Sequence, residues 1–198
     1  MSRFSIISTI ALATLGAVVA LPILTGFPVL VSQAQAAVPD LADAVALHNA
    51  ARDGTGTAAV AIDALTALTK AEPQNAVALA YLGSSYAISA RDASSVTDKI
   101  RFTNRGLRLL DEALALSPDD ITVLLVRANV QMKLPTMFAR AEPLVEDMLT
   151  LDRLYSAAAV PSLAKPMTDI YKVLAETQPD RSDWPAKLAA AQALAAGN

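Results

Sequence analysis

The sequence contains no cysteine, a single histidine and few aromatic side chains, which make up 5% of its 198 residues. Without cysteine the chain has no disulfide, no thiolate metal site and no lipid-modified N-terminal cysteine. A single histidine excludes a histidine-rich metal site. A net charge of −3 argues against a protein that coats nucleic acid. We therefore expect no cofactor, no metal and no nucleic-acid partner.

Hydrophobic residues, many of them alanine, make up 54% of the chain. Alanine loses no side-chain entropy in a helix, so this composition favours packed helices. Beyond the first 39 positions, apolar residues recur at helical spacing, and several of these segments follow proline or acidic residues. The pattern predicts an all-α protein with helices over residues 40–53, 57–71, 74–90, 97–116, 119–133, 137–151, 166–177 and 183–196.

The N-terminal segment is typical of an export signal. Residues 4–39 contain no charged side chain and follow Arg3, and the apolar run 4–31 leads to Ala34-Gln35-Ala36. A basic start, an apolar middle and small residues before a cleavage point are the layout of a secretory signal peptide. We predict that residues 1–36 are removed and that the protein is periplasmic or secreted. Because roughly 20 apolar residues can span a bilayer, the alternative is an uncleaved inner-membrane anchor formed by residues 4–31, the chain's one membrane contact.

Three prolines indicate an internal repeat. Pro39 and Pro73 lie 34 residues apart, and Pro73 and Pro118 lie 45 apart, which is 11 more than the first interval. Proline ends a helix because it lacks an N–H and clashes with the preceding turn. The motif Leu82-Gly83-x-x-Tyr86 follows Pro73. Gly83 would let a neighbouring helix approach closely, and Tyr86 would fill the space one turn later. Period and motif together resemble the tetratricopeptide repeat (TPR) family.

The resemblance implies a right-handed superhelix of antiparallel helix hairpins over residues 37–154, with C-terminal capping helices over 155–198. One repeat is strong. The other two are degenerate, with His48-Asn49 and Arg127-Ala128 where the family has Leu-Gly.

The resemblance also implies a function. TPR proteins are usually binding scaffolds without catalysis, and the first helix of each hairpin lines a groove that holds a peptide or a partner helix. We therefore expect an exported, non-catalytic scaffold, and alternatively a subunit that self-associates through its alanine-rich ends. The groove residues that the matching stretch and the repeat spacing imply are Val77, Ala80, Ser84, Ala87, Thr122, Leu125, Asn129 and Lys133.

The remaining candidates for chemistry are weak. His48 lies on a predicted amphipathic helix, and the sequence contains no G-x-S-x-G nucleophile motif. Gly54-x-Gly56 is too short for a phosphate loop and has no following lysine at the required spacing. A structural role for His48 is favoured. The alternative is a small exported all-α enzyme that uses His48 as a base.

A basic stripe follows the strong repeat. Residues 91–108 hold three more basic than acidic side chains in an acidic protein, and Arg101, Arg105 and Arg108 share a helical face. The 11 extra residues between the second and third prolines fall in this region. Such a stripe can hold an acidic segment of a partner. Alternatively it neutralises acidic side chains of neighbouring turns, namely Asp111, Glu112 and Asp119.

Overall fold

The computed structural model describes residues 38–158 and 160–197. The predicted signal peptide, its cleavage point and the alternative anchor over residues 4–31 lie outside these residues. Every regular element in the described part of the chain is a helix, which confirms the all-α class. Among the same residues, no helix is both long and apolar enough to cross a membrane.

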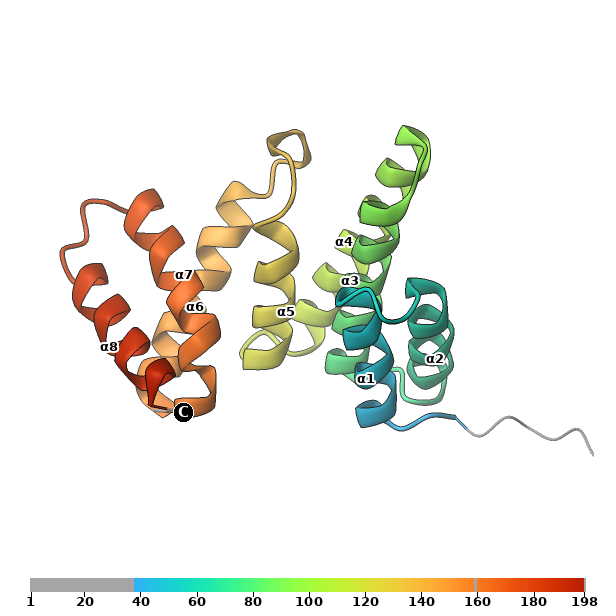
Figure 1. The fold of residues 1–198 in the computed structure, drawn as a ribbon, viewed down its shortest axis with the longest axis horizontal. Helices are drawn as coiled ribbons and strands as arrows, with labels where there is room; N and C mark the ends of the chain where they lie inside the picture. Colours follow the sequence, from blue (N-terminus) through green and yellow to red (C-terminus); the bar gives the residue numbers. More distant parts are fainter. Residues whose placement is uncertain (1–37, 159, 198) are drawn as a thin grey trace, which may run out of the picture. The chain divides into compact units, whose positions relative to one another are not determined.

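Eight α-helices and two short 3₁₀ helices make up the described fold, and each of the eight predicted helices is present (Figure 1). Their bounds are α1 Leu41–Arg52, α2 Ala58–Ala71, α3 Ala76–Asp92, α4 Val96–Leu116, α5 Ile121–Gln131, η1 Thr136–Phe138, α6 Ala141–Ala158, η2 Pro161–Leu163, α7 Ala164–Thr177 and α8 Trp184–Ala196.

The three spaced prolines mark the start of the first helix of a hairpin. A capping side chain follows each proline by one or two residues and accepts a hydrogen bond from a first-turn N–H. The capping oxygens belong to Asp40, Asn75 and Asp120, at 2.8, 2.9 and 2.8 Å from the donor nitrogens. Such caps satisfy N–H groups that have no partner within the helix. The proline rhythm therefore sets where α1, α3 and α5 begin.

Helix α6 differs most from its prediction, which was 137–151. Pro143 has no N–H and its ring would clash with the carbonyl of Ala139 four residues earlier, so the helix cannot include that turn. Ala139 instead adopts a left-handed conformation with φ of 50°. At the other end α6 continues to Ala158, because Leu154 and Tyr155 pack against the core. The predicted boundary between the repeats and the C-terminal capping helices, at residues 154 and 155, therefore falls inside α6.

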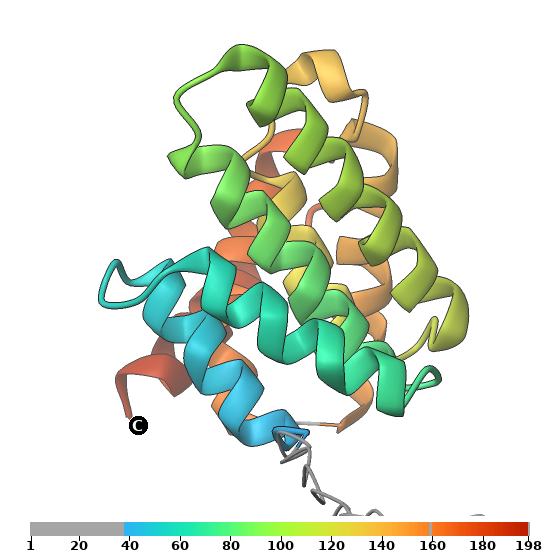
Figure 2. The same ribbon diagram turned by 90° about the vertical axis from the view of Figure 1, so that its right-hand side faces the viewer.

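Consecutive helices pack as hairpins: α1 with α2, α3 with α4, α5 with α6, and α7 with α8. Figure 2 shows α3 and α4 side by side along most of their length. The first helices also contact one another across hairpins, α1 with α3 and α3 with α5. This arrangement confirms the predicted helix hairpins.

The core is a row of three hydrophobic clusters that follow the order of the hairpins. One cluster joins α1 to α4, the next joins α3, α4 and α5, and the last joins α5 to α8. Each cluster thus involves only helices that are close in sequence, as in repeat proteins. Central side chains of the three clusters are Leu65 and Leu68, then Leu110 and Val123, then Tyr171, Leu174 and Trp184.

Two glycines let α3 and α4 approach closely. A Cβ built on Gly83 would lie 2.8 Å from the Gly106 carbonyl oxygen, and a Cβ on Gly106 would lie 2.6 Å from the Gly83 carbonyl oxygen. Tyr86 packs beside this contact and stacks on Phe102, with 6.3 Å between ring centroids. The close approach predicted for Gly83 is confirmed, whereas its partner Gly106 was not predicted.

Candidate functional site

His48 is buried against α3. Its Nδ1 lies 3.0 Å from the hydroxyl oxygen of Ser85, which itself donates a hydrogen bond to the Tyr81 carbonyl at 2.9 Å. Because a serine hydroxyl has one hydrogen, His48 Nδ1–H must be the donor to Ser85. A general base would need the reverse direction. His48 and Ser85 are also only 4% and 0% exposed, so the pair lies within the packing of α1 against α3.

Burial lowers the pKa of His48 to about 4, and the positive charge of Arg52 adds to this effect. The neutral ring packs edge-on against Tyr81, with 5.0 Å between centroids. Within the described residues, no group of three or more His, Cys, Asp or Glu side chains is arranged to hold a metal ion.

The buried histidine should make stability depend on pH. An unfolded His48 titrates near 6.5 and binds a proton more readily than the folded form, so acid favours unfolding. We expect its contribution to be fully present above pH 6.5 and to fall by about 3 kcal/mol as the pH drops through 4. Denaturant unfolding of wild type and His48→Gln over this pH range measures the difference. A difference that does not change with pH would contradict the assigned burial.

The predicted groove residues fall into two groups. Ala80, on α3, is 0% exposed and belongs to the hydrophobic cluster that α3 forms with α4 and α5. Val77 and Ala87 are half-buried and pack against that cluster. The close α3–α5 contact therefore removes Ala80 from any partner-binding role. The other predicted positions keep solvent-accessible surface. Three are half-buried, namely Ser84, Thr122 and Leu125. Asn129 and Lys133 are exposed, and Lys133 lies beyond the end of α5.

The basic stripe is exposed on α4, and two of its three arginines have acidic neighbours. Arg101 lies 2.8 Å from Asp98, and Arg108 lies 3.6 Å from Glu112. The guanidinium of Arg105 instead lies over the Tyr86 ring, 4.8 Å from its centroid. The alternative prediction was that the stripe neutralises Asp111, Glu112 and Asp119. Only Glu112 pairs with an arginine of the stripe, Arg108, whereas Asp111 and Asp119 pair with arginines outside it.

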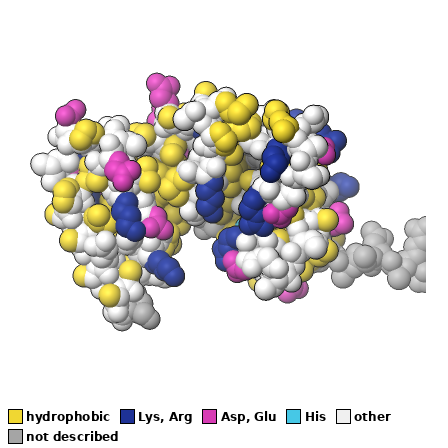
Figure 3. All heavy atoms as spheres, turned by 45° about the horizontal axis from the view of Figure 1, so that its top comes forward, with side chains coloured by type: hydrophobic (Ala, Val, Ile, Leu, Met, Phe, Trp, Pro, Cys, Tyr) yellow, Lys and Arg dark blue, Asp and Glu magenta, His cyan; other side chains and the backbone are white. Residues whose placement is uncertain are grey.

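The stripe borders a shallow surface depression between α3 and α4. Its floor holds the stacked rings of Tyr86 and Phe102, and the Arg101 guanidinium lies 4.8 Å from the Phe102 centroid. Figure 3 turns the top of Figure 1 toward the viewer, and on this face basic and hydrophobic side chains lie close together. We call this region the α3–α4 depression; it is lined by Tyr86, Arg101, Phe102, Asn104, Arg105 and Arg108.

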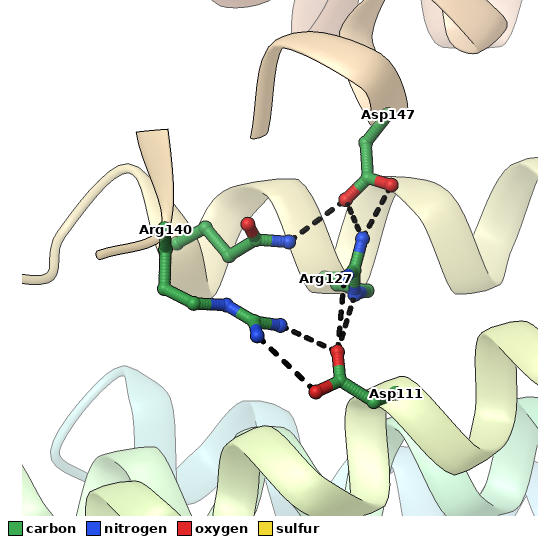
Figure 4. Close-up of polar contacts among 5 residues, drawn as sticks. Asp111, Arg127, Arg140 and Asp147 are labelled. Carbon is green, nitrogen blue, oxygen red and sulfur yellow. Dashed lines mark hydrogen bonds and ion pairs between the residues drawn. The ribbon is translucent and has the colours of Figure 1, made fainter. Parts of the chain in front are cut away.

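A charged network lies between α4, α5 and α6 (Figure 4). The Arg127 guanidinium donates to Asp111 at 2.9 Å and to both carboxylate oxygens of Asp147. Arg140 donates to Asp111 at 3.2 Å, and the Gln131 amide donates to Asp147 at 2.8 Å. The side chains of Arg127 and Asp147 are only 7% and 3% exposed. This network ties the third hairpin to the second.

The two carboxylates of the network differ in environment. Partial burial opposes ionisation of Asp111, but hydrogen bonds from Arg140 and Arg127 outweigh it and lower the pKa of that carboxyl. At Asp147 burial is the larger effect and raises the pKa, although Arg127 and Gln131 oppose it. This cluster was not predicted from the sequence. The available signal was Arg127 itself, a charged residue within the apolar segment 123–130.

A second polar cluster holds the C-terminal hairpin. Lys187 on α8 donates to both carboxylate oxygens of Asp152 on α6, at 2.6 and 2.7 Å, and the Tyr171 hydroxyl donates to the same group at 3.0 Å. Trp184 is fully buried beside them, with Arg181 3.9 Å above its ring. These contacts fix α8 against α6 and α7.

No protein-family model matches the chain. No curated protein matches it. The chain is similar in fold to the crystal structure of a thermophilic TPR protein of Thermus thermophilus, with a TM-score of 0.49 and 16% identity. The similarity covers 76% of this chain and 81% of that one.

Proposed function

We propose that this protein is a non-catalytic scaffold that binds a protein or peptide partner across the first helices of its hairpins. The observation that carries the proposal is the direct packing of α1 on α3 and of α3 on α5. We infer that the remaining faces of these helices form one binding surface, and that Ser84, Leu125 and Asn129 contribute to it. An amide such as Asn129 can donate to and accept from a peptide backbone, which suits an extended ligand.

The scaffold acts in the cell envelope after export, on the strength of the uncharged apolar segment and Ala34-Gln35-Ala36. Mass spectrometry of the protein from its native envelope should give an N-terminus at Ala37. A chain that keeps Met1 and stays with the membrane after a carbonate wash would instead favour the anchor.

Site-specific photo-crosslinking tests the binding surface. A photoreactive amino acid at Ser84 or Asn129, introduced in the native cells, should give a discrete adduct with one partner because both positions lie on the first helices. Asp63 and Lys70, exposed on α2, are the matched control positions and should give none. Equal adducts from both sets would refute the groove.

Self-association is the second candidate, because α8 exposes several alanines and Leu194. Adducts between two copies of the chain, together with a mass that rises with concentration in light scattering, would favour it over a separate partner.

A further inference from the structure

The 11 extra residues of the strong repeat lengthen helices and not a loop. Helices α3 and α4 have 17 and 21 residues, against 12 and 14 in α1 and α2, and only residues 93–95 join them. The added part of α4 leaves Val96 71% exposed, so it buries little apolar surface. The lengthened end of α3 does bury Ile88 and Ala90, but core building does not account for the first turn of α4, whose exposed surface is available for binding.

The α3–α4 depression combines an apolar floor with oriented cations. Tyr86 and Phe102 stack at an interplanar angle of 28°, and each carries one guanidinium over its face. A guanidinium that stacks on a ring keeps its N–H groups in its own plane, where they can reach a carboxylate. The rings thus pre-order Arg101 and Arg105, which reduces the entropy lost when a ligand binds.

The positive charge of this surface is little neutralised within the chain. The pairs Arg101–Asp98 and Arg108–Glu112 are exposed, and such pairs contribute little. Arg105 has no acidic side chain within 4 Å among the described residues. The whole protein is acidic, so it repels a long polyanion, whereas a short acidic segment meets only the local excess of positive charge.

We propose that the α3–α4 depression binds an acidic helical segment of a partner protein, which places an apolar side chain against the edges of the Tyr86 and Phe102 rings. Arg101, Arg105 and Arg108 span about 10 Å along α4, at helix spacings of four and three residues. An acidic helix with glutamates at the same spacing can present one carboxylate to each arginine. The inference rests on the proposed scaffold function but uses a different surface from the first-helix groove.

A defined peptide tests the site on the purified full-length protein. The probe is a fluorescein-labelled helical peptide with glutamates at positions i, i+4 and i+7 and one leucine on the same face, measured by fluorescence anisotropy. We expect Arg101→Glu with Arg105→Glu to weaken binding by about tenfold or more. Phe102→Ala should weaken it less, and binding should weaken with salt because exposed charges are screened beyond about 8 Å.

The matched control is Arg153→Glu with Lys172→Glu, which makes the same change in net charge at other exposed ion pairs. It should bind like wild type. Equal loss in both double variants, or no binding of the probe at low salt, would overturn the proposal. Tighter binding of a single-stranded oligonucleotide, or self-association that the Arg101/Arg105 variant abolishes, would also overturn it. Circular dichroism verifies that each variant is folded.

The peptide experiment does not involve the first-helix groove. Failure of the probe with intact crosslinks at Ser84 and Asn129 would reject the α3–α4 depression alone. Loss of those crosslinks with intact probe binding would reject the groove and retain the depression.

Discussion

Gly83→Ala and Gly106→Ala should each destabilise the protein, although the same change in an exposed helix would stabilise it by about 1 kcal/mol. At these positions the new methyl group meets a backbone carbonyl of the facing helix, at 2.8 and 2.6 Å, and backbone cannot move aside as a flexible side chain can. Overpacking typically costs about 1–3 kcal/mol, and Gly83→Leu should exceed Gly83→Ala. Thermal and denaturant unfolding measure the change.

Gly197→Ala is the matched control, because an added Cβ there has no neighbour closer than 3.8 Å. It should leave the thermal midpoint nearly unchanged. If Gly83→Ala and Gly106→Ala melt like wild type, α3 and α4 do not approach as closely as described.

Arg127→Met should be at least as damaging, with a loss of about 3–5 kcal/mol, because it leaves the carboxylate of Asp147 buried without its charged partner. Burial already raises the pKa of Asp147, and removing Arg127 raises it further. Protonation then relieves the unpaired charge, so the loss should be largest near neutral pH and shrink as the pH falls. Unfolding by denaturant at several pH values measures both effects.

The double variant Arg127→Met with Asp147→Leu should recover part of the stability, since it removes both charges. Lys172→Met, which breaks an exposed pair with Asp169, is the control and should change stability by less than about 0.5 kcal/mol. A strictly additive double variant would mean that the two side chains do not interact.

The sequence predicted helices well where local signals determine them. The spaced prolines located the starts of α1, α3 and α5, and the structure adds a capping Asp or Asn after each; both effects act within a few residues. The prediction of α6 was wrong at both ends. Pro143 excludes the helical turn that precedes it, and contacts with distant helices extend the C-terminal end. Helix ends that depend on tertiary packing leave a weak local signal.

The candidate sites were predictable only in part, for the same reason. Arg101, Arg105 and Arg108 could be placed on one face by spacing alone. The aromatic floor requires Tyr86 and Phe102 to meet across two helices, and the buried network joins Arg127 to residues 16 and 20 positions away. Burial of Ala80 follows from the contact of α3 with α5, which helical periodicity within α3 does not specify.

The row of three clusters also determines how the fold can open. Each cluster joins neighbouring hairpins, so separating α7 and α8 from α6 disturbs the last cluster and leaves the first intact. Stability in such a chain is a sum of nearest-neighbour terms, and amide exchange should be fastest at the ends and slowest around α3 and α4. A ligand that spans α3 and α5 would couple two of these units, and exchange protection would then spread from the middle of the chain toward both ends.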